Sequence, residues 1–328
     1  MSDCLVVGGG VIGMMSARYL TQAGAKVRLI DQQACGLESS WAGGGIISPL
    51  YPWHYDDLTN ELSLASQAVY EDLCAELYQN SGIDPEYIKS GLLMMDEYDS
   101  DVAKAWLKKF KIDYTPHAKG ALFSQIAQAR NPRLIQALKA DIERQGVEII
   151  ENVKALDLIT DQVQVQGVKT SKGDYLADNV VACSGAWSSQ WLTLEDEVFP
   201  MKGQMIVIQA QPGDLAHIVL DQGRYIIPRK DGKILVGSTM QDIGFDKSTD
   251  ESIGQELFEF AVARFEQLRD CPIVHHWSGF RPATRSGSVI LGRDENYQNL
   301  YINTGHFRNG LNMAPESARR ITQLIAHV

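Results

Sequence analysis

The first 31 residues alternate between short apolar runs and one amphipathic helical pattern. Residues 3–7 form an apolar run, residues 11–22 repeat apolar side chains at helical spacing, and residues 26–30 form a second run. Short apolar runs next to glycine are typical of buried strands, whereas a spacing of three to four residues is typical of a helix. The pattern therefore predicts a strand, a glycine turn, a helix and a second strand that ends in Asp31.

The pattern changes in character after about residue 198. Before that point helices and apolar strands alternate, as in an α/β domain. Beyond it strands follow one another, and the Asp231-Gly232 pair favours a tight hairpin, so an antiparallel sheet is predicted. The expected fold class is α/β, in an α+β arrangement of two domains: a Rossmann-type domain and an antiparallel-sheet domain. Further helices are predicted over 58–80, 100–111, 132–144, 251–267 and from 311 onwards, and further strands over 91–95, 147–150, 162–166, 179–182, 204–208, 224–229, 233–237 and 300–303.

Length and charge narrow the classes of protein that the chain can belong to. With 328 residues, of which 45% are hydrophobic and 22% charged, it has the size and composition of a two-domain globular protein. Its net charge of −11 argues against non-specific binding to nucleic acid or to an anionic membrane surface. No apolar stretch approaches the length of a membrane-spanning helix. We therefore expect no nucleic-acid partner and no transmembrane segment.

The cysteines indicate a reducing compartment. The five of them are scattered, without a Cys-x-x-Cys pair or a Cys/His spacing suited to a metal, so no metal site is expected. The glycine turn begins almost at the first methionine, and no targeting segment is expected before it. An odd number of cysteines without a leader is typical of reduced thiols, and a cytoplasmic protein is the expectation.

The glycine turn has the spacing of a dinucleotide-binding loop. Gly8 permits the tight turn, Gly10 leaves room for a pyrophosphate beside the backbone, and Gly13 lets the helix pack closely on the sheet. The N-terminus of that helix offers free N–H groups to the phosphates. Asp31 is placed to accept hydrogen bonds from the ribose hydroxyls. We infer a site for an adenine dinucleotide; a glycine-rich turn of an ordinary α/β protein is the alternative, and the motif alone fits both NAD(P) and FAD.

Two further segments bear on the choice of cofactor. Ser39 and Ser40 offer hydroxyls to phosphate. The glycines at 43–45 expose backbone to a flat group at close range, although a flexible loop would have a similar sequence. Residues 304–310 form a glycine-bounded loop that leads into the last predicted helix. The N-terminus of a helix stabilises negative charge such as that of a reduced flavin. This last segment favours FAD.

Five blocks of the sequence together closely resemble one family of flavoproteins. They are residues 7–13 with Asp31, and the segments 39–47, 225–237, 279–285 and 304–310. In these blocks the chain is similar to the glycine oxidases of the D-amino-acid oxidase family. The resemblance implies a two-domain oxidoreductase with non-covalent FAD, since the C-terminal block lacks the cysteine that carries flavin in the related sarcosine oxidases. Relatives often carry alanines where this chain has glycines at 43–45, which should alter the room beside the flavin.

The resemblance also implies roles for individual residues. Arg281 would grip the carboxylate of the substrate, Tyr225 would donate its hydroxyl to the same carboxylate, and Arg308 would lie at the substrate. A planar guanidinium matches a carboxylate in shape and remains charged, although structural ion pairs for the arginines and plain packing for Tyr225 are alternatives. The positions that fall where the family contacts or lines FAD are Val11, Ile12, Asp31, Gln32, Ser39, Ser40, Gly44, Gly45, Ile46, Val153, His306, Phe307, Arg308, Asn309, Gly310, Leu311 and Asn312. The glycine turn adds Gly8, Gly10 and Gly13 to the expected FAD site, and Gly185 joins them as one of the small residues that follow the strand over 179–182 beneath the expected cofactor.

The activity that the resemblance implies is oxidative deamination of glycine or another small D- or N-methyl amino acid to a 2-oxo acid, ammonia and hydrogen peroxide. The flavin does the chemistry, and no side chain is assigned as a certain catalytic group. Alternatives are a dehydrogenase that uses another electron acceptor, a sarcosine or proline oxidase, and a flavin-binding module without activity. A role in thiamine synthesis is implied by the family alone. The preferred substrate, the electron acceptor and homo-oligomer formation stay open.

The two domains are expected to interleave along the chain. Residues 1–80, 131–198 and 275–328 are predicted to form a discontinuous FAD-binding domain. Residues 81–130 and 199–274 are predicted to form the substrate-binding domain.

Overall fold

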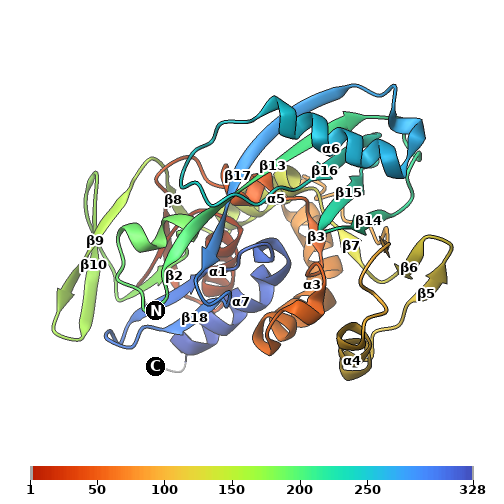
Figure 1. Ribbon diagram of the computed structural model, residues 1–328. Coiled ribbons are helices and arrows are strands. Elements are labelled where there is room, and N and C mark those ends of the chain that lie inside the picture. The colour runs from red at the N-terminus through yellow and green to blue at the C-terminus, as the bar shows by residue number, and fades with distance from the viewer. Residues whose placement is uncertain (1–2, 327–328) are drawn as a thin grey trace.

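The computed structural model describes residues 3–326, which fold around two large β-sheets with helices packed against both (Figure 1). One sheet has six strands and the other has eight, and a three-stranded and a two-stranded sheet lie beside them. The predicted α/β fold with a second, largely antiparallel unit is confirmed. Residues 1–2 and 327–328 of the expected FAD-binding domain lie outside the described part.

The six-stranded sheet contains the unit predicted from the first 31 residues. Strand β1 (Asp3–Val7) pairs in parallel with β2 (Lys26–Ile30), and α1 (Val11–Gln22) connects the two. A helical crossover between parallel strands is the βαβ unit of dinucleotide-binding folds. Across the sheet the strands are β18 (Ile290–Arg293), β19 (Leu300–Thr304), β12 (Asn179–Ala182), β1, β2 and β8 (Glu148–Ile150), with β18 as an antiparallel edge strand.

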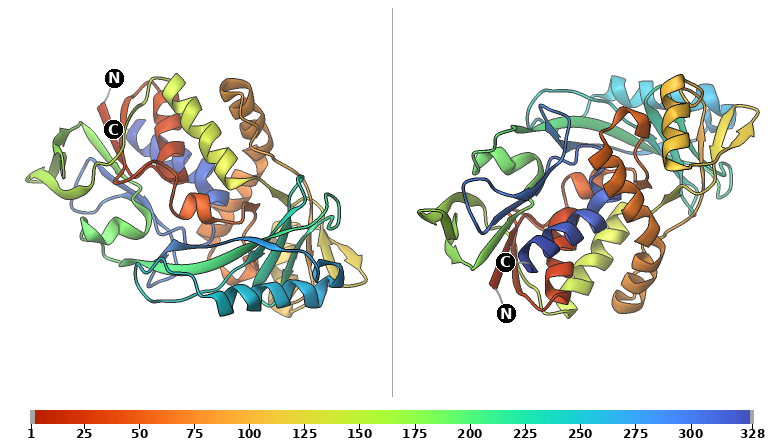
Figure 2. Two further views of the ribbon diagram at one scale, coloured as in Figure 1. Left: turned by 90° about the horizontal axis from the view of Figure 1, so that it is seen from above. Right: turned by 90° about the horizontal axis from the view of Figure 1, so that it is seen from below.

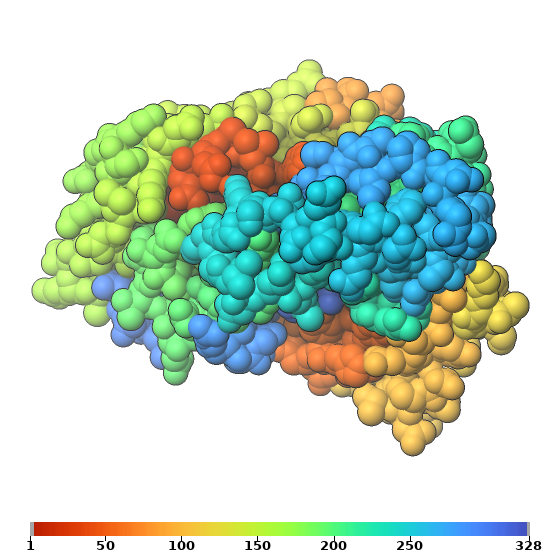
Figure 3. Space-filling view, turned by 45° about the horizontal axis from the view of Figure 1, so that its top comes forward, coloured from red at the N-terminus to blue at the C-terminus, as the bar shows by residue number. Residues whose placement is uncertain are grey.

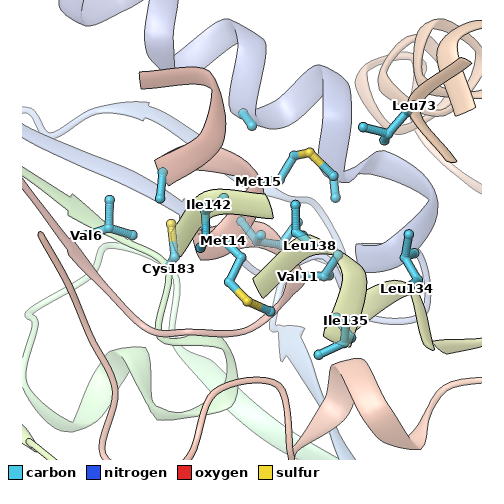
Figure 4. Close-up of a cluster of buried hydrophobic side chains, with 14 of the residues drawn as sticks. Val6, Val11, Met14, Met15, Leu73, Leu134, Ile135, Leu138, Ile142 and Cys183 are labelled. Atoms are coloured by element: carbon cyan, nitrogen blue, oxygen red, sulfur yellow. The ribbon is translucent and has the colours of Figure 1, made fainter. Parts of the chain in front are cut away.

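Both faces of β1 are buried, which explains its unbroken apolar sequence. Cys4 and Val6 belong to a core shared with the helices on one face, and Leu5 and Val7 to a core on the other. Figure 4 shows part of the first core, in which Met14 of α1 lies near side chains of the helix Asn131–Arg144. The first face is covered by α1, α5 (Asn131–Arg144) and α7 (Gly310–Ala326), and α3 (Asp57–Ser81) lies outside these helices. The second face is covered by the three-stranded sheet of β9 (Ala155–Asp161), β10 (Gln164–Thr170) and β11 (Gly173–Leu176).

The strand predicted over 162–166 begins two residues later than expected. Gln162 has a φ of +53°, in the left-handed region, and lies in the turn between β9 and β10. The polar/apolar alternation runs on through this turn, so the pattern by itself does not mark the bend.

The eight-stranded sheet is antiparallel except for one pair of strands. Its long strands β13 (Val198–Gln209) and β17 (Ile273–Thr284) pair along most of their length. The predicted hairpin at Asp231-Gly232 is confirmed, with Gly232 at a φ of +80°. Beyond β13 the sheet continues through β16 (Lys233–Gly237), β15 (Arg224–Pro228), β14 (Ile218–Asp221), β4 (Leu92–Met94), β6 (Gly120–Phe123) and β5 (Thr115–His117), and β14 and β4 are its parallel pair.

One helix covers the outer face of this sheet, away from the helices of the six-stranded sheet (Figure 2). It is α6 (Glu251–Arg264), whose Leu257 and Phe260 pack on the sheet residues Ile206 and Ile208. The predicted helix over 251–267 ends earlier, at Arg264, and a 3₁₀ turn follows at Glu266–Leu268.

The pairing of β17 crosses one of the predicted domain boundaries. The sequence places residues 275–284 in the FAD-binding domain, but their partner is β13 of the eight-stranded sheet, from Thr284 opposite Val198 onwards. Strand pairing alone would group residues 273–284 with the eight-stranded sheet. The division into an FAD-binding and a substrate-binding domain stays a prediction.

The other elements are short, and all but α4, which lies between β4 and β5 of the eight-stranded sheet, belong to connections between the two sheets. They are α2 (Ser39–Ala42), β3 (Ile46–Ile47), α4 (Asp101–Phe110), β7 (Ala127–Gln128) and the 3₁₀ helices Pro52–His54 and Gly185–Gln190. Within residues 3–326, no helix is long and apolar enough to cross a membrane.

Candidate active site

A deep cleft with an empty volume of about 1690 Å³, partly open to solvent, runs between the two large sheets. It begins at the glycine turn after β1 and passes the segment from α2 to β3. It ends among β13, β15 and β17 of the eight-stranded sheet. The cleft thus joins the predicted nucleotide-binding end to the predicted substrate end.

The glycine turn has the close packing that its spacing predicts. Gly8 has a φ of +110°, and a Cβ there would lie 2.4 Å from the carbonyl oxygen of Cys183. A Cβ on Gly13 would lie 1.8 Å from the carbonyl oxygen of Gly8. Neither position has room for a side chain, so both require glycine. The backbone of the turn and the N-terminus of α1 border the cleft. At that N-terminus the N–H of Val11 donates to Ser40 Oγ at 2.8 Å.

Asp31 lies at the end of β2, on the wall of the cleft. Its two carboxylate oxygens accept hydrogen bonds from the N–H groups of Gly9, at 2.6 Å, and Gln33, at 2.8 Å. Burial raises the pKa of this carboxyl, and the two backbone donors oppose that rise. Each oxygen has further acceptor capacity, which suits the hydroxyls of a ribose. Val153 lines the same end of the cleft.

The glycines at 44 and 45 let the loop approach the substrate end. A Cβ on Gly44 would lie 2.6 Å from Ile227 Cδ1 and 3.1 Å from Tyr225 Cε2. Gly45 has a φ of +76°, which only glycine adopts readily. Buried Arg229 secures the loop by donating to the carbonyl oxygen of Gly44 at 2.8 Å. Alanine at position 44 would therefore crowd the tyrosine that is predicted to bind substrate.

Arg281 extends from β17 into the substrate end of the cleft. Its Nη1 donates to the carbonyl oxygen of Thr239 at 3.1 Å, and its Nη2 donates to Ser238 Oγ at 2.5 Å. Burial lowers the pKa of its guanidinium, the charge of Arg308 acts in the same direction, and Tyr225 opposes them. An arginine keeps its charge despite such a shift, so this end of the cleft is positive.

Arg308 and Tyr225 complete the substrate end. Arg308 Nη2 donates to the carbonyl oxygen of Gly223 at 3.2 Å, and the Tyr225 hydroxyl lies 3.4 Å from Met205 Sδ. Within the described part of the chain, no carboxylate forms an ion pair with Arg281 or Arg308. Two adjacent guanidinium groups without a counter-charge are strongly suited to an anionic ligand.

Nearly the whole described chain matches one known family. The DAO family, described as FAD dependent oxidoreductase, matches residues 3–324. The chain belongs to this family of FAD-dependent oxidoreductases.

Within the DAO family, the chain is similar to several proteins that carry a name. The chain is 38% identical to the glycine oxidase of Pseudomonas aeruginosa over 98% of this chain and 94% of that protein. It is 32% identical to the bifunctional protein ThiO/ThiG of a Nostoc species, covering 98% of this chain and 52% of that protein. A solved structure of glycine oxidase from Bacillus cereus has 25% identity and a TM-score of 0.91, and covers 100% of this chain and 95% of that one.

The residues of the cleft fit the FAD of this family. The side chain of Asn303, on β19, is fully buried and lines the cleft, and its Oδ1 has no partner among the described residues. Asn131 at the start of α5 lines the cleft in the same way, also with an unpartnered Oδ1. Together with the glycine turn and Asp31, these acceptors provide the polar contacts that a dinucleotide needs. Flavin binding by individual residues stays a prediction.

Most of the predicted site residues line the cleft. These are Gly8, Gly10, Val11, Ile12, Asp31, Gln32, Ser39, Ser40, Gly44, Gly45, Ile46, Val153, Gly185, Tyr225, Arg281, His306, Phe307, Arg308, Gly310 and Leu311. Gly13, Asn309 and Asn312 do not line it. Gly13 packs against the glycine turn, and both asparagines are buried around the start of α7.

His306 is buried beside α7 and interacts with Ser317 Oγ at 3.1 Å through Nε2. Burial lowers its pKa to about 3. A histidine that is neutral over the physiological pH range and hydrogen-bonded to a helix is better suited to line the flavin site than to transfer protons.

Several cleft residues gave no signal in the sequence. Met205 and Ser48 lie in apolar strand and loop segments, where nothing in the pattern distinguishes them from core residues. Trp187 stacks on Phe245 with ring centroids 5.0 Å apart, and both rings contact Phe280 edge-on. Phe245 belongs to the segment between β16 and α6, which lies across one face of the molecule beside the N-terminal region (Figure 3). Trp187 and Phe280 line the cleft, and only packing brings Phe245 against them.

A smaller cavity adjoins the cleft at Ser48, which lines both. Its walls include Trp53 and Trp106, whose indole N–H groups have no partner within the described chain. Since its described lining carries no charged side chain, this cavity does not offer the counter-charges that a zwitterionic amino acid requires. In residues 3–326, no group of three or more His, Cys, Asp or Glu side chains could hold a metal ion.

Proposed function

We propose that the protein catalyses oxidative deamination of glycine and other small amino acids, including N-methyl amino acids. The observation that carries the proposal is the pair of guanidinium groups, Arg281 and Arg308, beside Tyr225 at one end of the cleft and without a carboxylate partner in the described chain. The identity of 38% to a glycine oxidase supports the same substrate class.

FAD supplies the two-electron acceptor that this reaction needs. The protein itself contributes binding and orientation. Arg281 presents two N–H donors on one planar edge, which matches the two oxygens of a carboxylate. Tyr225 adds a hydroxyl donor, and Arg308 adds positive charge in a protein whose net charge is −11. Fixing the carboxylate in this way fixes the direction of the α-carbon toward the rest of the cleft.

The walls around these three residues favour a small substrate. Leu50, Met205 and Tyr225 are each at most 8% exposed and line the substrate end. Rigid apolar walls exclude water from the reacting group and leave little room for a long side chain. The amine must lose its ammonium proton before oxidation, and the proposal assigns no side chain to that step.

The electron acceptor and the setting of the reaction are part of the proposal. Oxygen as acceptor, with hydrogen peroxide as product, follows from the likeness to glycine oxidases. Within residues 3–326 the five cysteines form no disulfide, which agrees with a cytoplasmic location. A role in thiamine synthesis rests on the relatives that carry the name ThiO/ThiG. Assembly into a homo-oligomer stays a prediction.

The test is the visible spectrum of the purified protein, recorded anaerobically before and after addition of glycine, sarcosine and D-amino acids. The proposal expects a flavin band that one of these compounds bleaches, and recovery of the band when air is admitted. Bleaching without recovery in air would replace the oxidase with a dehydrogenase that uses another acceptor. A flavin band that none of the compounds bleaches would refute the proposed substrates.

A further inference from the structure

A two-residue turn between β14 and β15 supports the side chain of Arg308. The carbonyl oxygen of Gly223 in this turn accepts from Arg308 Nη2 at 3.2 Å, which is the one hydrogen bond that the described residues give this guanidinium. Gln222 and Gly223 have φ values of +48° and +73°. Positive φ at both central residues is the geometry of a type I′ turn, which glycine adopts easily and glutamine does not.

The N–H groups of this turn are bound by two side chains from distant parts of the chain. The N–H of Gln222 donates to Asp96 Oδ2 at 2.6 Å, and the N–H of Gly223 donates to the hydroxyl oxygen of Tyr51 at 3.0 Å. The Tyr51 hydroxyl in turn donates to Asp96 Oδ1 at 2.7 Å. The tyrosine, the carboxylate and the turn thus form a closed ring of hydrogen bonds.

The backbone of Tyr51, whose hydroxyl belongs to this ring of hydrogen bonds, has an unusual conformation. Its φ of +51° lies in the left-handed region, which a bulky residue seldom occupies, and only 8% of it is exposed. A strained backbone persists when the surrounding contacts hold it, and such positions concentrate near functional sites. Burial raises the pKa of the Tyr51 phenol, so the hydroxyl keeps the proton that it donates to Asp96.

We propose that Tyr51 and Asp96 are positioning residues that hold Arg308 toward the substrate carboxylate through the turn at 222–223. The turn can present its carbonyl to Arg308 in one orientation only while both of its N–H groups are bound. This inference rests on the proposed function, since it takes the ligand of Arg308 to be the carboxylate of the amino acid. Neither Tyr51 nor Asp96 carries a signal for this role in the sequence.

A second contact between the same two segments supplies a matched control. His54 Nε2 lies 2.9 Å from Glu97 Oε2, three residues beyond Tyr51 and one beyond Asp96. Both of these side chains are more than half exposed, and no hydrogen bond joins them to the turn at 222–223. An exposed pair of this kind contributes little to stability. The imidazole of His54 also lies 6.1 Å from the ring of Tyr51, between centroids. Removal of His54 therefore loosens the same loop but leaves the hydrogen bonds of Tyr51 and Asp96 in place.

The experiment compares the Tyr51→Phe and His54→Ala holoenzymes with the wild type. The KM for glycine and the dissociation constant of glycolate, a carboxylate without an amine, are measured, the latter from the change in the flavin spectrum. Tyr51→Phe should raise both by about fivefold to twentyfold, the effect of one or two lost hydrogen bonds, with kcat changed less than about threefold. His54→Ala should leave both within about twofold of the wild type.

A double-mutant cycle separates positioning from general damage. In an Arg308→Met background, Tyr51→Phe should cause no further loss of glycolate binding, because the group that it orients is gone. A similar loss in both backgrounds, or an unchanged KM in Tyr51→Phe, would overturn the proposal. If Tyr51→Phe does not fold, Asp96→Asn takes its place, since its amide can accept from only one of the two donors.

The outcome also distinguishes this inference from the proposed function. Glycolate binding that weakens in Tyr51→Phe, in a protein whose flavin no amine bleaches, would keep the positioning role and refute the proposed reaction. Bleaching by glycine with equal glycolate affinities in the wild type and Tyr51→Phe would keep the reaction and refute the positioning role.

Discussion

Replacement of Gly203 by alanine should disable the substrate site without touching the substrate. Gly203 lies on β13 opposite Gly279 of β17, and Arg281 follows two residues after Gly279 on β17. A Cβ at position 203 would lie 2.3 Å from both Nη1 and Nη2 of Arg281 and 2.6 Å from its Cζ. Ordinary contact begins near 3.4 Å, so the guanidinium must move by about 1 Å or more.

The size of the effect follows from the hydrogen bonds that depend on this placement. Arg281 donates to the carbonyl oxygen of Thr239 at 3.1 Å, and a shift of about 1 Å away from it breaks that bond. The same shift misaligns the two N–H groups that face the substrate carboxylate. A hydrogen bond to a charged group contributes about 1.5–3 kcal/mol, so the loss of two raises KM by about 100-fold or more. The three heavy atoms nearest to the added methyl group all belong to Arg281, so the rest of the cleft should keep FAD.

The assay is the flavin content of purified Gly203→Ala together with its KM for glycine and its affinity for glycolate. Gly292→Ala is the matched control, because it places the same methyl group on β18 where no heavy atom lies within 4 Å. A Gly203→Ala protein that binds FAD and keeps a KM within about threefold of the wild type would show that the methyl group does not displace Arg281. Loss of flavin from Gly203→Ala would show instead that the methyl group disturbs the sheet.

Three further predictions concern single residues. Gly13→Ala places a Cβ 1.8 Å from the carbonyl oxygen of Gly8, so this variant should purify without a flavin band; a normal band would contradict the packing of α1. Arg281→Ala should keep FAD but raise KM sharply, and an unchanged KM would remove Arg281 from the site. Burial holds the pKa of His306 at about 3, below the ordinary value of 6.5, so protonation favours the unfolded chain. The free energy of unfolding should therefore be constant above pH 6.5 for this group and fall below it, by about 1.4 kcal/mol per pH unit until pH approaches the folded pKa. Urea unfolding at several pH values measures this slope, which should flatten in His306→Gln; an equal slope in both proteins would contradict it.

The local elements of the fold could be predicted because their signals lie within a few residues. The spacing of Gly8, Gly10 and Gly13 after an apolar run predicts the βαβ unit, and the structure shows the close contacts that require glycine at the first and the last. The Asp231-Gly232 pair predicts a hairpin for the same local reason. The strand predicted over 162–166 was displaced because its alternation continues through the turn.

The candidate site could be predicted only where its residues stand in a distinctive block. Arg281, Tyr225 and Arg308 were identified by resemblance, and the structure brings all three to one end of the cleft. Met205 and Trp187 carried no such signal, since an apolar residue in a strand or short helix has the same pattern whether it faces a core or a cofactor.

The sequence by itself predicted the kind of protein: two domains, a dinucleotide-binding turn, and a set of cations for a small anion in an acidic chain. Only the tertiary structure decided how these parts meet. The pairing of β17 with β13, the contact between Gly203 and Arg281, and the ring that joins Tyr51 and Asp96 to Gly223 all connect segments far apart in the chain. Such contacts depend on the packing of the whole molecule, because no local preference of a residue specifies which distant group it will touch.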